Sequence, residues 1–192
     1  VLHNRSVELA KKFNVNMEVL SSFEKVPGTI VKEENTVEKM LIRGIARDND
    51  IARIALVNIH DTPGKAFQIF SLLAKKKINV DVILQSIGRD GSKDISFTVS
   101  RDDLEPALRV IDENNSLIGA ESVVHDENVS KVSVVGAGMT SNPGVAALMF
   151  EALYDAGINI QMISTSEIRV SVLINVKDAE NAVRAIHSKF NL

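Results

Sequence analysis

The chain has 192 residues, of which 45% are hydrophobic and 4% aromatic, and its formal net charge is −3 at pH 7. Such a composition is typical of one or two small globular domains. The weak negative charge argues against a nucleic-acid partner, and the lack of Cys excludes disulfides and thiolate metal sites. Apolar runs fall short of the roughly 20 residues of a membrane span, and the first residues are charged where a signal peptide is apolar. We therefore expect a cytoplasmic protein without membrane contact.

The N-terminal segment differs from the rest of the chain. HNRSVELAKKFNV (3–15) has the apolar spacing of an amphipathic helix, and MEVLSSF (17–23) reads as a strand. VPGTIVKEENT (26–36) reads as an exit toward a linker. One helix and one strand cannot bury a core, so we expect residues 1–35 to be the end of another domain followed by a linker.

The middle of the chain predicts a compact set of strands and helices. RIALVNI alternates apolar and polar positions as a half-buried strand does, and Pro63 and Gly64 end it before a helix. Asp102 or Asp103 is a plausible N-cap for a second helix. The remaining predicted elements are the strands INVDVILQS (78–86), DISFTV (94–99) and GAESVVHD (119–126), and the helix DDLEPALRVIDEN (102–114).

This set of elements is repeated later in the chain. TPGKAFQIFSLLAKKKINVDVILQS (62–86) is followed by NPGVAALMFEALYDAGINIQMISTS (142–166), so Gly64 and Gly144 lie 80 residues apart, as do Asn79 and Asn159. A period of this length indicates a duplicated small domain rather than a solenoid repeat. Each copy predicts a ferredoxin-like βαββαβ unit of the α+β class, with an antiparallel sheet and both helices on one face.

The second copy ends before its last strand, which would leave the edge of its sheet unpaired. EKMLIRGIAR (38–47) alternates like a strand and precedes the first copy, so we expect Met40–Ala46 to complete the second sheet. The two domains would then be interlocked. The expected boundaries are 36–48 for this strand, 49–127 for the first domain and 128–192 for the second.

No group of residues in the sequence predicts catalysis. The Gly-x-Gly in VVGAGMTS (134–141) lacks the third glycine of a dinucleotide site and is better explained as a loop that lets a strand turn. The four histidines have no metal-ligand spacing. Ser164, Thr165 and Ser166 have no His or acid placed by a motif to activate them.

The loops before the two repeated helices are more informative. HDTPGKA (60–66) leads into a helix N-terminus, whose free N–H groups attract an anion, and Asp61 could take an ammonium. MTSNPGVA (139–146) has the same layout with Ser141 and Asn142 instead. These features suit an α-amino acid, although simple helix capping by Asp, Thr or Ser explains them equally well.

The tandem units, with Pro-Gly before each helix and Ile-Asn before the next strand, resemble the ACT domains of aspartate kinase. The resemblance covers the whole chain. VLHNRSVELAKKF resembles the end of that family's kinase domain, GIARDNDIARIAL the start of its regulatory half, and VGAGMTSNPGVAA with STSEIRVSV its second ACT unit.

The resemblance implies effector sites where the first unit of one chain faces the second unit of its partner in a homodimer. For threonine it implies His60, Asp61, Pro63, Gly64, Lys65, Ala66, Gln85, Asn159 and Ile160. For a second effector, lysine, it implies Met139, Thr140, Ser141, Asn142, Gly144, Val145, Asn79, Val80, Asp81, Ser164, Thr165, Ser166 and Glu167. Asp81 could pair with the ammonium of a lysine ligand.

The resemblance also implies a role in feedback control of aspartate phosphorylation in lysine, threonine and methionine biosynthesis. ATP and Mg²⁺ would bind only in a kinase domain, which would be the chain's partner, and no cofactor is expected in this chain. Three alternatives stay open: a free-standing amino-acid sensor, a phosphotransferase, and a single-stranded RNA binder. The second lacks a phosphate loop, and the third lacks the aromatic side chains on which bases stack.

Overall fold

A computed structural model describes residues 2–24, 26–31, 41–86, 88, 91–137 and 144–192. The chain divides into two compact units, residues 1–39 and 40–192. The larger unit holds both copies of the duplication, which we call the first repeat (β4 to β7, with the helices between them) and the second repeat (β3 and β8 to α6).

The N-terminal unit contains α1 (Asn4–Lys12), β1 (Met17–Val19) and β2 (Thr29–Val31). Helix α1 is capped by His3, whose Nδ1 accepts a hydrogen bond from the N–H of Arg5 at 3.2 Å. Strands β1 and β2 pair antiparallel, with Met17 opposite Val31. The prediction that residues 26–36 only lead to a linker is therefore wrong for β2, a strand too short to show an alternating pattern.

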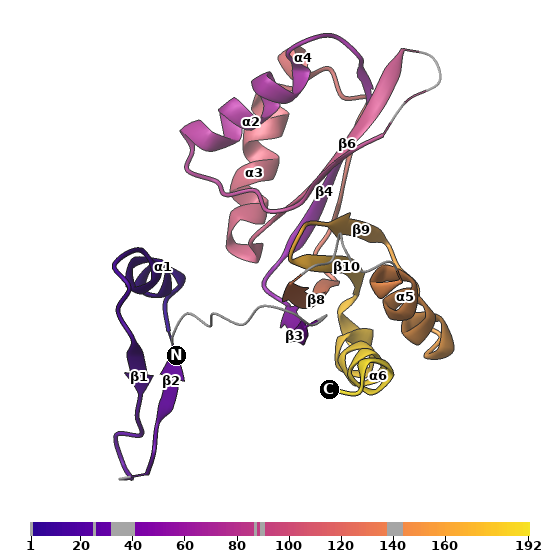
Figure 1. Cartoon of the computed structure of the whole chain (residues 1–192). Coiled ribbons are helices and arrows are strands. Elements are labelled where there is room, and N and C mark those ends of the chain that lie inside the picture. The colour runs from indigo at the N-terminus through magenta and orange to yellow at the C-terminus, as the bar shows by residue number, and fades with distance from the viewer. Residues whose placement is uncertain (1, 25, 32–40, 87, 89–90, 138–143) are drawn as a thin grey trace. The chain divides into compact units, whose positions relative to one another are not determined.

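The first repeat is a four-stranded antiparallel sheet in the order β5-β6-β4-β7. Figure 1 shows α2 and α3 along one face of this sheet. Large apolar side chains from the sheet and both helices, among them Ile54, Phe97, Leu73 and Ile111, form its buried core. Its elements are β4 (Ala52–His60), α2 (Lys65–Lys75), β5 (Ile83–Gln85), β6 (Ser92–Val99), α3 (Arg101–Glu113), α4 (Asn115–Ile118) and β7 (Ser122–Asp126).

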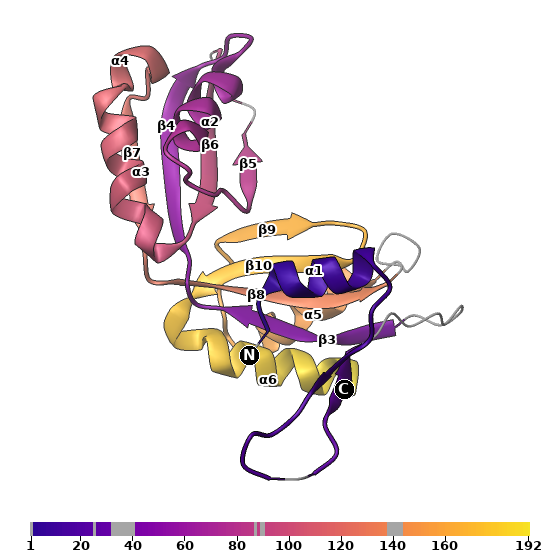
Figure 2. The same cartoon turned by 90° about the vertical axis from the view of Figure 1, so that its left-hand side faces the viewer.

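The second repeat has the sheet order β3-β8-β10-β9, which Figure 2 shows as successive strands. Strand β3 pairs antiparallel with β8 and occupies the place that β7 has in the first repeat. This pairing confirms the interlocked fold class predicted from the missing last strand. The elements are β3 (Leu41–Asp48), β8 (Val129–Ala137), α5 (Val145–Asp155), β9 (Met162–Thr165), β10 (Arg169–Asn175), the 3-10 helix η1 (Val176–Asp178) and α6 (Ala179–Phe190).

Two local predictions in the first repeat are wrong. Helix α3 is capped by Ser100, whose hydroxyl accepts from the N–H of Asp103 at 3.2 Å, and not by Asp102 or Asp103. The strand predicted over residues 78–86 is limited to β5. Before β5, the Thr98 hydroxyl accepts from the N–H of Val82 at 3.0 Å, while the Thr98 carbonyl oxygen accepts from the N–H of Asp81 at 3.1 Å, so the pairing with β6 is irregular here.

A small apolar cluster joins the two repeats. It consists of Ile51 and Val82 from the first repeat with Val129, Met162 and Leu173 from the second. Ile51 and Val129 hold equivalent positions in the duplication, as do Val82 and Met162. The junction therefore buries matching residues of both copies, which favours one fixed arrangement of the repeats in this unit.

Candidate functional site

The turn between β4 and α2 leaves a helix N-terminus open. Gly64 is the N-cap residue with φ of +92°, and no side chain caps the helix. The N–H of Lys65 bonds to Thr62 O at 3.3 Å and that of Gln68 to Gly64 O at 2.9 Å. Within the described part of the chain, the N–H groups of Ala66 and Phe67 have no acceptor. Helix capping by Asp61 or Thr62, which the sequence left open, is therefore not found here.

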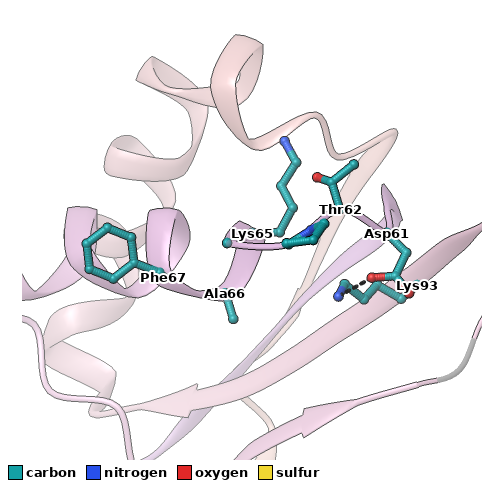
Figure 3. Close-up of a pocket in the computed structure, with 8 residues that line it drawn as sticks. Asp61, Thr62, Lys65, Ala66, Phe67 and Lys93 are labelled. Carbon is teal, nitrogen blue, oxygen red and sulfur yellow. Dashed lines mark ion pairs between the residues drawn. The ribbon is translucent and has the colours of Figure 1, made fainter.

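An open pocket of about 570 Å³ lies at this helix N-terminus (Figure 3). Asp61 and Lys93 form an ion pair in it, with 2.5 Å between Oδ1 and Nζ. The Asp61 side chain is 57% exposed and that of Lys93 only 9% exposed. The lining residues are Asp61, Thr62, Pro63, Gly64, Lys65, Ala66, Phe67 and Lys93.

The charge of Lys65 is directed away from this ion pair. Its Nζ donates to the carbonyl oxygens of Leu117 at 2.7 Å and Ile118 at 3.1 Å, at the end of α4. Figure 3 shows the Lys65 side chain pointing away from Asp61 and Lys93. Lys65 therefore holds α4 against the start of α2, and Lys93 supplies the positive charge next to Asp61.

The structure brings together most of the first predicted set. Asp61, Pro63, Gly64, Lys65 and Ala66 line the pocket. His60 ends β4 and Gln85 ends β5; both are exposed and neither lines it. Asn159 and Ile160 precede β9 in the second repeat and do not line it either.

Lys93 was not predicted, although the sequence carries a signal for it. Lys93, Ile95, Phe97 and Val99 alternate along β6 as its buried residues, with Thr98 also buried beside them. A lysine in such an apolar row is unusual, since Lys is rarely buried without a partner. The partner, Asp61, lies 32 positions earlier, across the turn that follows β4.

Part of the second predicted set also comes together. A cavity of about 70 Å³ is lined by Asp81, Ser164, Thr165 and Ser166, together with the unpredicted residues Val82, Lys131, Arg169 and Ser171. Asn79, Val80 and Glu167 are neighbours in sequence that do not line it. Gly144 caps α5 with φ of +105° and Val145 is buried. Met139, Thr140, Ser141 and Asn142 lie outside the described residues.

Asp81 already has cationic partners within the chain. Its carboxylate forms an ion pair with Lys131 and lies 4.0 Å from Arg169. Lys131 also lies 3.4 Å from Asp48 at the end of β3. An incoming ammonium would have to compete with Lys131 for this carboxylate.

The residues that the structure describes contain no cluster of three or more His, Asp or Glu side chains suited to a metal ion. No helix among them has the length and apolar character to cross a membrane.

Comparison with known proteins identifies the family. The ACT domain family matches residues 54–114 and 132–190, one stretch in each repeat. A crystal structure of aspartokinase alpha and beta subunits superposes with a TM-score of 0.75 at 49% identity, covering 79% of this chain and 100% of that chain. The chain belongs to the aspartokinases, as a tandem of their ACT domains.

Further relatives agree with this assignment. The regulatory subunit of aspartate kinase from Thermus thermophilus, in its ligand-free form, has a TM-score of 0.74 at 40% identity, covering 78% of this chain and 98% of that chain. An aspartate kinase of Pseudomonas putida is 47% identical over 100% of this chain and 47% of its own length. The chain spans about half the length of the curated relatives it matches.

Proposed function

We propose that this chain binds threonine in the pocket at the start of α2 and thereby restrains an aspartate kinase domain. The supporting observation is the open N-terminus of α2 beside Asp61. The free N–H groups of Ala66 and Phe67 suit the carboxylate of an α-amino acid. The exposed Asp61 carboxylate suits its ammonium. Both groups line one pocket of the first ACT domain.

The proposal includes a homodimer in which a partner completes the pocket. Asn159 is exposed and lies outside the pocket of its own chain, so it is free to approach the first repeat of a partner. Strands β5 and β9 are the edges of their sheets, and they carry the exposed side chains of Ile83, Leu84 and Ile163. Apolar sheet edges of this kind favour pairing with another chain.

Lysine is the second candidate effector, at the cavity beside Asp81. This assignment is the weaker of the two, because the cavity is only about 70 Å³ against about 570 Å³ and because Asp81 faces two cations of its own chain, Lys131 and Arg169. ATP and Mg²⁺ are assigned to the kinase domain and not to this chain. That domain lies in the same polypeptide or in a separate subunit, and the similar chain from Thermus thermophilus is itself a regulatory subunit. The proposal keeps the cytoplasmic location expected from the sequence.

Ligand binding of this kind is enough for feedback control. A coupling free energy of about 1–3 kcal/mol between an effector site and a substrate site changes the substrate affinity roughly 5- to 150-fold. A ligand held between two chains also stabilises the dimer by mass action. Threonine should therefore raise both the melting temperature and the dimeric fraction of the chain.

The test is calorimetric titration of the chain with L-threonine and then L-lysine, with its mass measured by light scattering. We expect a dimeric mass and threonine binding that is lost in Asp61→Ala. Asp102→Ala, an exposed acid in the first turn of α3, is the matched control and should leave binding unchanged. A folded chain that releases no heat with either amino acid would contradict the proposal.

A further inference from the structure

Lys93 is the charged side chain that lies deepest in the α2 pocket. It occupies the buried row of β6 beside Ile95 and Phe97, with 9% of its side chain exposed. Removing an ammonium from water is costly unless a counter-charge is near. Among the described residues, Asp61 is the acid that pairs with Lys93. The ion pair with Asp61 compensates part of this cost and keeps the Lys93 ammonium charged in the lining of the pocket.

The ion pair presents two opposite charges at different depths. The Asp61 side chain is 57% exposed, while that of Lys93 is 9% exposed. The open N-terminus of α2 adds partial positive charge to the same pocket. The ammonium of a zwitterion bound here would lie near the Asp61 carboxylate. Its carboxylate would lie near the Lys93 ammonium and the N-terminus of α2.

The charge balance of the pocket distinguishes between amino acids. Asp61 is the single acid in its lining, and Lys93 is the cation beside it, because the ammonium of Lys65 is bound by the carbonyl oxygens of Leu117 and Ile118. An amino acid with an uncharged side chain adds one charge of each sign, so every charge finds an opposite partner. An amino acid with a second ammonium, such as lysine, adds a cation for which the lining has no acid left. That cation would share the pocket with Lys93, and like charges repel each other at such short range.

We propose that Lys93 is the specificity-determining residue of this pocket, selecting α-amino acids with uncharged side chains and excluding those with a second ammonium. The inference rests on the proposed function of the pocket as an amino-acid site. It adds the residue that determines which amino acids enter this pocket. Lys93 acts by binding the ligand carboxylate while it repels a cationic side chain.

The test uses Lys93→Met, which keeps the length of the buried stem and removes the charge. L-threonine is titrated into the chain, and L-lysine is then used to displace bound threonine, so that both readings refer to the same pocket. In the unmodified chain we expect the affinity of the pocket for lysine to be at least about 10-fold lower than its affinity for threonine. In Lys93→Met, threonine should bind about 10-fold more weakly and the preference over lysine should shrink by a similar factor.

Three further variants separate specificity from folding. Lys93→Arg keeps the charge and should keep the preference for threonine. Lys93→Gln provides a second neutral variant should Lys93→Met fail to fold, as judged by circular dichroism. Lys75→Met, on the exposed last turn of α2, should change neither affinity.

The outcomes distinguish this inference from the proposed function. If the unmodified chain binds threonine and the neutral variants keep the same preference, the role of Lys93 is refuted and the threonine site stands. If the unmodified chain binds neither amino acid, the proposed function falls and this inference falls with it. A preference that shrinks in both neutral variants and is retained in Lys93→Arg supports the inference.

Discussion

Lys131 on β8 in the second repeat forms an ion pair with Asp81, which precedes β5 in the first repeat. The Lys131 side chain is only 12% exposed and also lies 3.4 Å from Asp48. The same two repeats share the apolar cluster that contains Val82 and Leu173. A charged contact and an apolar one therefore act together at the junction between the two ACT domains of one chain.

Replacing Lys131 by Met should destabilise the chain by about 1–2 kcal/mol. Met keeps the apolar stem but leaves Asp48 and Asp81 without their shared cation. The cost stays below that of a fully buried pair because the two carboxylates are 43% and 36% exposed and partly screened by water. Urea unfolding at one protein concentration measures the difference. Lys177→Met, an exposed lysine of η1, should change stability by less than about 0.5 kcal/mol.

A second prediction concerns Gly64, which begins α2 with φ of +92°. An added Cβ would meet no atom within 4 Å, so the cost of Gly64→Ala comes from the backbone conformation alone. We expect a loss of about 1–2 kcal/mol together with weaker threonine binding, because the open N–H groups would be reoriented.

Gly44 on β3 is the matched control for Gly64. Its added Cβ also meets nothing within 4 Å, but its φ lies outside the left-handed region. Gly44→Ala should therefore be neutral or stabilising by up to about 1 kcal/mol. Thermal unfolding of both variants measures the two changes in stability. Equal losses of stability at Gly64 and Gly44 would show that the positive φ of Gly64 is not the cause.

The architecture was predictable because it depends on patterns that repeat along the chain. The copies share the spacing from Pro-Gly to Ile-Asn, and the absence of a last strand in the second copy pointed to the segment that became β3. Strand β2 was missed because three residues show no periodicity. Ser100 was missed as the cap of α3 because Asp102 and Asp103, which follow it after Arg101, offered the same chemistry.

The site was less predictable, since its charged contacts join residues far apart in the chain. The loop 60–66 could be found because a turn before a helix has a local sequence signature. For Lys93 the sequence showed only a lysine in an otherwise apolar row. For Lys131 it showed no feature that indicated a role in the site. Lys131 meets Asp81 only once both domains are folded and in contact.

Ser133 on β8 and Ser171 on β10 provide a third prediction. They face each other in the register of the strands, with 2.8 Å between their Oγ atoms, and both are buried. Either single change to Ala leaves one buried hydroxyl without its partner and should cost about 1 kcal/mol. The double variant should cost clearly less than the sum of the two, with a coupling of about 0.5–1.5 kcal/mol.

The measurement is a double-mutant cycle by urea unfolding. Single costs that add to within about 0.3 kcal/mol in the double variant would show that the two hydroxyls do not stabilise each other. In that case the buried serines would be explained by their small size alone.

The last prediction concerns Lys189 on α6, which holds α6 against α5. Its Nζ lies 2.9 Å from Glu151 Oε1 and 3.2 Å from Asp155 Oδ2. These hydrogen bonds, first that of Glu151 and then that of Asp155, raise the pKa of Lys189 above its usual 10.5. Since folding favours the charged form, the stabilisation is complete below pH 10.5 and is lost as the pH rises through the higher pKa of the folded state.

Lys189→Met should therefore be less stable than the unmodified chain by a constant amount between pH 7 and roughly pH 9.5. Above pH 10.5 the two urea midpoints should converge, because the unmodified chain loses the ammonium that α5 binds. Lys177→Met, measured over the same range, corrects for the general effect of alkaline pH on the fold. The difference in urea midpoint between Lys189→Met and the unmodified chain could instead stay constant or widen up to pH 11. That result would show that Glu151 and Asp155 do not stabilise the charged form of Lys189.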